Sequence, residues 1–214
     1  GRYTFHPGTE ARVVVGTRVV DDRGNPHDAD VVIVCTGAAH GGLARQLAGD
    51  LPVRRVRLQM MQTAPLDEPL TTAIADGDSL RYYPAYSGNA LDTLRRSENQ
   101  DPIADEHRRR LPCVPRPDAG VPFGAPLGSG EPFPFDVTEA PYAYLTGVVE
   151  ELLGRPLPPL RQRWAGVYSQ CVDPGRLVYR KEVGGGVWVV TGPGGRGMTL
   201  GPVIGEQTAN EIGL

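Results

Sequence analysis

The sequence predicts an α+β fold, or the last part of a larger α/β protein, on two observations. Valine-rich strand patterns come first, helical patterns follow, and a second set of strands leads into a terminal helix. Glycine and proline are abundant, with 28 and 21 of the 214 residues, which favours strands joined by many turns. The net charge of −3 gives no basic excess, so a nucleic-acid-binding surface is not expected.

The first quarter of the chain contains two strand patterns and a short helix. We expect a strand over residues 11–20, a turn over 21–25 and a second strand from Asp30 to Cys35. Leucines spaced by four residues predict a helix from Gly41 to Leu51. A long strand, VRRVRLQMMQT, is expected next, from Val53 to Thr63.

The middle of the chain alternates between short strands and helices. A strand is expected from Ser79 to Tyr83, and the charged segment 90–111 is expected to be a solvated helical region. Seven prolines make residues 112–135 a loop or an interrupted strand. Apolar residues at helical spacing predict a helix from Glu139 to Leu153, which Gly154 should end.

The last part of the chain has the clearest strand patterns. Strands are expected over Arg163–Ser169, Leu177–Arg180 and Val187–Thr191, and a terminal helix over Pro202–Ile212. Between the last strand and the helix lies the segment 192–197, GPGGRG.

The segment 192–197 matches G-x-G-x-x-G between a strand and a helix, the local setting of a dinucleotide-binding loop. Only 17 residues follow Gly197, with no further strand and no acidic residue about twenty positions on, so an NAD-binding βαβ unit is disfavoured. Glycines let the backbone approach a ligand closely, and the helix-initial N–H groups would face electron-rich atoms. The same glycines are equally consistent with a turn that serves packing alone.

Four segments, in order along the chain, resemble the D-amino-acid oxidase-like FAD-dependent oxidoreductases. These segments are DADVVIVCTGAAH, VRLQMMQTAP, RWAGVYSQCVD and VVTGPGGRGMTLGPVIGEQTANEI. The combination of LQMMQTAP, LRYYPAY, PFPFDV, RWAGVYSQ and GGRGMTL is most similar to a bacterial branch proposed to act on aminophosphonates. The resemblance implies a two-domain flavoprotein that oxidises the C–N bond of a small amine, amino acid or aminophosphonate by hydride transfer to FAD.

The resemblance also implies a domain layout. Residues 1–50 and 163–214 would be part of the FAD-binding domain, and residues 51–162 the substrate-binding domain. The family's first strand, glycine turn and helix have no counterpart here, so we expect a C-terminal portion that lacks an N-terminal segment and by itself binds FAD poorly or not at all.

Cofactor contacts follow from the same resemblance. Thr36 and Gly37 would lie on the adenosine side of FAD, although ending a strand is an equally simple role for them. The residues along the flavin ring would be Gly194, Gly195, Arg196, Gly197, Met198 and Thr199. We expect Gly195 and Gly197 to be irreplaceable by valine, because the side chain would occupy cofactor space and resist a positive φ. Thr199 stands where a sarcosine-oxidase-like relative carries lysine, which leaves oxidase and dehydrogenase activity open.

Substrate contacts are expected at Tyr168, on the strand that passes the flavin, and at Arg81 and Tyr83, on the predicted strand of the substrate domain. An ordinary alternation of buried and exposed side chains would explain the last two equally well. No catalytic residue is assigned, and the four histidines show no metal-ligand spacing, so no metal is expected.

The leading hypothesis is therefore an FAD-dependent amine oxidoreductase with a small-molecule substrate. The alternative is a non-catalytic subunit or binding protein of the same fold that needs a partner chain. Three cysteines without close spacing are expected to be reduced thiols, which favours the cytoplasm. No apolar stretch is long enough to span a bilayer, so no membrane partner is expected.

Overall fold

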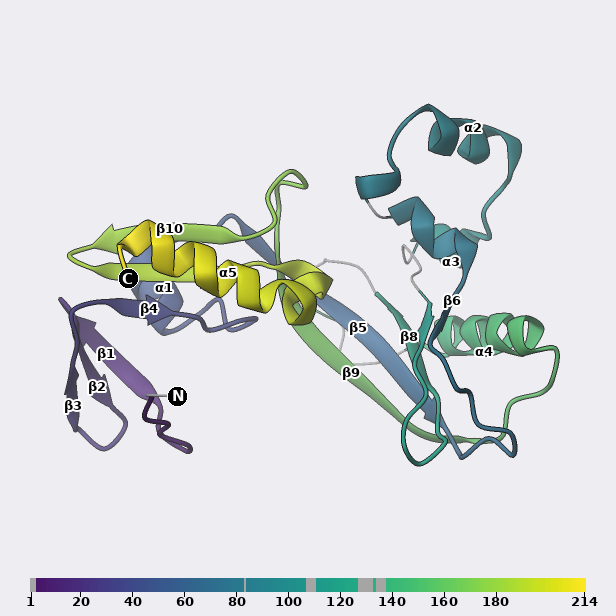
Figure 1. Cartoon of the computed structure of the whole chain (residues 1–214), viewed down its shortest axis with the longest axis horizontal. Coiled ribbons are helices and arrows are strands. Elements are labelled where there is room, and N and C mark those ends of the chain that lie inside the picture. The colour runs from purple at the N-terminus through teal and green to yellow at the C-terminus, as the bar shows by residue number, and fades with distance from the viewer. Residues whose placement is uncertain (1–2, 83, 107–110, 127–132, 134–137) are drawn as a thin grey trace. The chain divides into compact units, whose positions relative to one another are not determined.

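The computed structural model describes residues 3–82, 84–106, 111–126, 133 and 138–214 (Figure 1). The chain forms two compact units, described separately below. Unit 1 comprises the residues up to Arg55 together with Tyr168–Leu214, and unit 2 comprises Val56–Val167. The sequence-based boundaries were placed after residues 50 and 162. Which unit serves the cofactor and which the substrate stays a prediction.

Unit 1 is built on a three-stranded sheet in the order β10-β11-β4. Strands β10 (Tyr179–Gly184) and β11 (Val187–Thr191) form an antiparallel hairpin, and β4 (Val32–Val34) runs parallel to β11. Helix α5 (Gly197–Ile212) lies along this hairpin, as the yellow helix in Figure 1 shows. The strand expected over Leu177–Arg180 corresponds to β10, which begins two residues later, at Tyr179, and continues to Gly184.

A buried cation attaches α5 to the sheet. The Arg180 guanidinium donates to Thr208 Oγ1 at 2.9 Å and pairs with Glu211 at 2.7 Å, and only 14% of the Arg180 side chain is exposed. Because the two acceptors lie one helical turn apart, the contact fixes the helix face that meets β10.

The chain enters unit 1 through a small antiparallel sheet, β1 (Ala11–Val15), β2 (Arg18–Asp21) and β3 (Pro26–Asp28). The single strand expected over residues 11–20 is wrong, because Gly16 adopts a φ of 56° and turns the chain back on itself. The six-residue helix α1 (Leu43–Ala48) adds Leu43 and Leu47 to an apolar cluster. The buried members of that cluster are Val32, Val34, Cys171, Tyr179, Val187 and Val189.

The predicted turn over residues 21–25 is organised by the buried Asp21 carboxylate. It accepts hydrogen bonds from the backbone N–H groups of Arg23 and Asn25 and from the Asn25 side chain, and it lies 3.2 Å from His27 Nε2. Burial raises the pKa of Asp21, but the hydrogen bonds from Asn25, His27 and Arg23 outweigh burial and lower this pKa well below its ordinary value.

Unit 2 contains most of a second sheet, in the order β8-β5-β9. Strand β5 (Val53–Thr63) matches its predicted bounds, and its partners are β8 (Pro122–Pro126) and β9 (Leu160–Cys171). Helix α4 (Ala140–Leu153) packs on this sheet and ends where predicted, at Gly154 with a φ of 63°. The buried core consists of Met61, Leu66, Leu111, Cys113, Val121, Phe123, Tyr142, Leu145 and Val149.

The rest of unit 2 consists of short elements. They are β6 (Ile74–Ala75), η1 (Gly77–Tyr82), η2 (Pro84–Tyr86), α2 (Asn89–Ser97), α3 (Pro102–Glu106) and β7 (Pro112–Cys113). The strand expected over Ser79–Tyr83 is wrong, because the described part of this segment forms 3-10 helical turns. The Asp76 carboxylate accepts hydrogen bonds from the Ser79 backbone N–H and hydroxyl, which favours a helical start over an extended chain.

The terminal helix begins five residues earlier than predicted. A short 3-10 turn, η3 (Gly194–Arg196), leads directly into α5 at Gly197, and Pro202 lies inside the helix. Proline removes the bond to the carbonyl of residue 198, but Met198 is 96% exposed, so water can solvate that carbonyl. Among the described residues, none of the helices combines the length and the apolar character that a bilayer-spanning segment requires.

Candidate cofactor and substrate sites

Two loops meet at one edge of the unit 1 sheet. Val34 of β4 pairs with Val189 of β11 in parallel register, so the carboxyl ends of both strands lie at the same edge. Thr36 and Gly37 follow β4, and the segment 192–197 follows β11. A hydrogen bond of 3.1 Å to the Gly37 carbonyl comes from Thr191 Oγ1, at the end of β11, and so joins the turn after β4 to the residue that precedes the glycine loop. The structure thus brings together the residues expected to contact the cofactor.

The first glycine of the loop is required by the protein's own packing. Gly192 has a φ of 78°, and a Cβ atom built on it would lie 2.9 Å from both Cys171 Sγ and Val53 Cγ1. Gly194 also has a positive φ, of 65°. Gly195 lies in η3, and Gly197 has a helical φ of −54°, so the expected positive φ at these two positions is wrong. Gly192 is not among the predicted cofactor contacts, although the G-x-G-x-x-G pattern contains it.

The start of α5 exposes backbone donors beside this loop. No side chain caps the helix, and no acidic residue lies in its first turn. The Gly197 N–H donates to the Gly194 carbonyl, whereas the first-turn N–H groups of Met198 and Thr199 have no acceptor within an α-helix. Both residues are exposed. The partial positive charge of a helix N-terminus is therefore available at this edge of the sheet.

The turn after β4 is compact and open on its outer side. Thr36 Oγ1 donates to the Ala39 carbonyl at 2.9 Å, and the Ala39 N–H donates back to Thr36 at 3.1 Å. Gly37 has a φ of 59°, and a Cβ atom built on it would meet no atom within 4 Å. Thr36 therefore closes a turn, and Gly37 leaves open space above its backbone.

The residues at this edge fit an FAD-type cofactor. Glycine backbone, open space above Gly37 and uncapped helix-initial N–H groups form a donor set suited to electron-rich and anionic groups.

Tyr168, the predicted substrate contact of unit 1, lies half-buried on β9, next to the buried Ser169. Strand alternation turns these two side chains to opposite faces.

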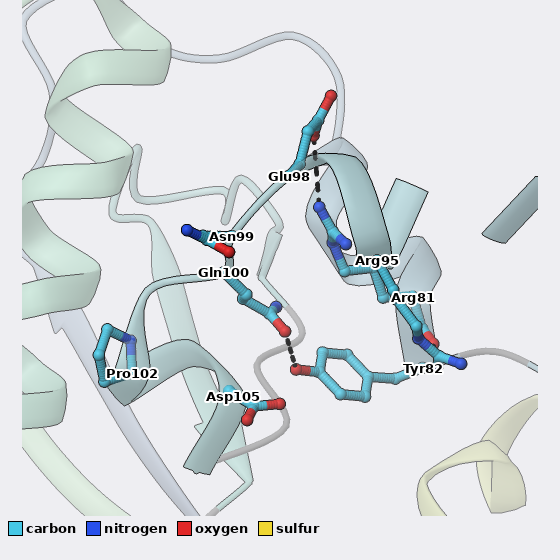
Figure 2. A pocket seen from close by; sticks show the side chains of 8 residues that line it. All are labelled: Arg81, Tyr82, Arg95, Glu98, Asn99, Gln100, Pro102 and Asp105. Atoms are coloured by element: carbon cyan, nitrogen blue, oxygen red, sulfur yellow. Dashed lines mark hydrogen bonds and ion pairs between the residues drawn. The ribbon is translucent and has the colours of Figure 1, made fainter. Parts of the chain in front are cut away.

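Arg81, the expected substrate-binding cation, lies in η1 and is 7% exposed. Its guanidinium donates to the Asp78 carboxylate. It also pairs with Glu98 at 3.3 Å (Figure 2). Two carboxylates thus balance the charge of Arg81. Tyr83, expected beside it, lies outside the described residues.

The Arg81 guanidinium borders a cavity of about 500 Å³ in unit 2 (Figure 2). Its lining carries charges of both signs, from Arg81, Arg95, Glu98 and Asp105. Tyr82 crosses the cavity and donates its hydroxyl to Gln100 at 2.8 Å. Burial, opposed by the Gln100 hydrogen bond, raises the pKa of Tyr82. The described residues contain no cluster of three or more histidine, cysteine, aspartate or glutamate side chains suited to a metal ion.

Solved structures with a similar fold are amine and amino-acid oxidoreductases by name. Glycine oxidase from Geobacillus kaustophilus superposes with a TM-score of 0.59 at 16% identity, covering 95% of this chain and 48% of its own. L-proline dehydrogenase from P. horikoshii gives 0.61 at 17% identity, with 95% and 49% covered. Iminodiacetate oxidase from Chelativorans sp. BNC1 gives 0.60 at 17% identity, with 92% and 46% covered.

The chain thus spans about half the length of these structures. A comparison with curated proteins finds no match. The family model described as FAD dependent oxidoreductase, DAO, matches residues 3–211, nearly the whole chain. The parallel strands, the glycine loop after the last strand and this match together assign the chain to the DAO family of FAD-dependent oxidoreductases.

Proposed function

We propose that this chain contributes the flavin-side loops and a substrate-binding region to an enzyme that oxidises the C–N bond of a small amine. The observation that supports it is the meeting of the Thr36-Gly37 turn, the glycine loop and the uncapped start of α5 at one sheet edge. FAD, when bound, would supply the hydride acceptor for the oxidation. Loss of a hydride from carbon and a proton from nitrogen would convert the amine to an imine, which water would hydrolyse to a carbonyl compound and ammonia or an amine.

In this proposal the chain's own residues supply position and electrostatics. The segment from Gly194 to Thr199 would hold the flavin ring, and its amides would stabilise negative charge on the reduced cofactor. Thr36 and Gly37 would hold the adenosine side, where the open space above Gly37 can admit a ligand. Arg196 and Met198 are part of the same contact surface, and the 96% exposure of Met198 leaves its side chain available for it.

Valine substitutions in the loop test the cofactor site. In the natural protein, Gly195→Val and Gly197→Val should abolish FAD binding measured by flavin fluorescence titration, because the β-branched side chain occupies cofactor space. At Gly197 even a Cβ atom would approach Pro193 Cγ to 3.2 Å. Gly205→Val is the matched control, since Gly205 lies in the same helix with nothing within 4 Å of its Cβ position.

Full FAD occupancy in both loop variants would show that the loop is a packing turn. Failure of the wild-type protein to bind FAD at all would favour the alternative of a non-catalytic subunit. Yellow colour and a flavin absorption spectrum of the purified protein give the same distinction without mutation.

We further propose an aminophosphonate as the substrate, bound by Tyr168, Arg81 and Tyr83. Support comes from the resemblance of LQMMQTAP, LRYYPAY and RWAGVYSQ to the aminophosphonate branch, and from tyrosine at position 168. A tetrahedral phosphonate accepts from one guanidinium and several hydroxyls, whereas a planar carboxylate suits a bidentate arginine fork. Arg81 would exchange one of its carboxylate partners for the phosphonate, and Glu98, 63% exposed, is the one that can move away.

Steady-state kinetics on 2-aminoethylphosphonate, sarcosine, glycine and D-alanine test this substrate class. We expect the aminophosphonate to give the highest kcat/KM of the four. Arg81→Ala should lower the kcat/KM for the aminophosphonate by the equivalent of about 2–4 kcal/mol. The readout is the ratio of kcat/KM for aminophosphonate over glycine, which does not depend on the folded fraction. A preference for D-alanine, with an unchanged ratio in Arg81→Ala, would refute both the substrate and the residue.

The compartment is a further proposal. Cys35, Cys113 and Cys171 are free thiols, which supports a reducing environment such as the cytoplasm.

A further inference from the structure

Three side chains form a hydrogen-bonded series beneath the two loops of unit 1. His40 Nε2 lies 2.7 Å from Ser169 Oγ, and Ser169 Oγ lies 3.2 Å from Thr191 Oγ1. Thr191 Oγ1 in turn donates to the Gly37 carbonyl at 3.1 Å. Ser169 and Thr191 are buried, at 3% and 4% exposure, and His40 is half-buried. The series connects the segment after β4, strand β9 and the end of β11.

The three hydrogen bonds of the series can all form only if their protons point the same way, from His40 toward Gly37. A carbonyl oxygen has no proton to give, so the single Thr191 hydroxyl proton points to Gly37. Thr191 Oγ1 must then accept the hydrogen bond that it shares with Ser169, so the single hydroxyl proton of Ser169 is donated to Thr191. Ser169 Oγ must therefore accept from an N–H at His40 Nε2. Both the Nε2–H tautomer of neutral histidine and the imidazolium provide that proton.

We propose that His40, Ser169 and Thr191 are positioning residues that set the spacing between the Thr36-Gly37 turn and the glycine loop. This inference rests on the proposed function, in which both loops contact FAD. The spacing between the loops then affects how tightly FAD binds. The backbone pairing of β4 with β11 ends at Val34 and Val189. The Thr191 hydroxyl extends the connection beyond that ladder to Gly37.

The direction of the series can be tested without any cofactor. The measurement is a long-range ¹H–¹⁵N correlation spectrum of the ¹⁵N-labelled chain. In the neutral form of His40, it should show the ring proton on Nε2. Ser169→Ala removes the acceptor and should shift the His40 nitrogen resonances toward a mixture of tautomers, whereas Ser169→Thr keeps them. A proton on Nδ1 in the wild-type chain, or unchanged resonances in Ser169→Ala, would overturn the inference.

The positioning role requires an FAD titration of the natural protein. Thr191→Val keeps the side-chain shape but removes the hydroxyl, and we expect it to weaken FAD binding about tenfold, whereas Thr191→Ser should stay within about twofold. Thr63→Val is the matched control. Thr63 is also buried, but it lies in unit 2, where its hydroxyl accepts a hydrogen bond from the Val121 N–H.

The outcomes separate this inference from the proposed function. Wild-type affinity in Thr191→Val, or an equal loss in Thr63→Val, would overturn the positioning role and leave the FAD site intact. Absence of FAD binding by the wild-type protein would overturn the proposed function, and the positioning role with it. In that case the His40 tautomer would still report on the hydrogen-bond direction.

Discussion

Replacing Gly192 with alanine should destabilise unit 1 more than any surface change, because two separate costs add at this position. The first is backbone strain, since a φ of 78° costs a residue with a Cβ atom about 1–2 kcal/mol. The second is steric. The new Cβ would lie 2.9 Å from Cys171 Sγ and from Val53 Cγ1, and 3.2 Å from the Cys171 backbone nitrogen. Such overpacking costs about 1–3 kcal/mol, so we expect a total of about 2–5 kcal/mol.

Urea denaturation of Gly192→Ala and Gly24→Ala measures the two costs separately. Gly24 has a similar φ of 81°, but its Cβ position has nothing within 4 Å, so Gly24→Ala carries the backbone cost alone. Adding Cys171→Ala to Gly192→Ala removes one of the crowding atoms and should recover part of the steric cost. Equal destabilisation by Gly192→Ala and Gly24→Ala would refute the steric argument, and no recovery in the double variant would refute the contact with Cys171.

Two further predictions concern unit 1. Because the folded-state pKa of Asp21 is lowered, its contribution to stability is present above the unfolded pKa of about 3.9 and is lost as the pH falls below it. The stability difference between wild type and Asp21→Asn should therefore shrink on acidification, and a constant difference in urea titrations from about pH 6 to pH 3 would contradict it. Arg180→Ala should cost about 2 kcal/mol and speed hydrogen exchange in α5, whereas Arg176→Ala, 64% exposed, should do neither.

Elements with a dense apolar pattern and clear breakers could be predicted from the sequence. Strand β5 runs from Val53 to Thr63 as expected, between Pro52 and Pro65, and α4 ends at Gly154 as expected. The misassigned elements depend on single side chains. The Asp76 carboxylate converts the expected strand at Ser79 into a 3-10 helix, and the left-handed backbone of Gly16 divides one strand into two. Periodicity averages over such local contacts and therefore misses them.

The candidate site could be predicted in its parts but not in its connections. The glycine loop follows a recognisable pattern, and Thr36-Gly37 ends a recognisable strand. Their contact depends on the pairing of β4 with β11. The hydrogen-bonded Gly37, just after β4, and Thr191, at the end of β11, lie 154 residues apart in the sequence. The contact between His40 and Ser169 spans 129 residues. No local pattern encodes such pairs, because the parallel sheet brings them together only after the intervening chain has folded.

The glycines at this sheet edge are constrained by different causes. Gly192 is fixed from within, since its φ and its contacts with Cys171 and Val53 both exclude a side chain. Gly37 is fixed by its backbone alone, because the space above it is open. Gly41 has neither a positive φ nor a described atom within 4 Å of its Cβ position, and the same is true of Gly205 in α5, so backbone and packing leave both positions open to a side chain.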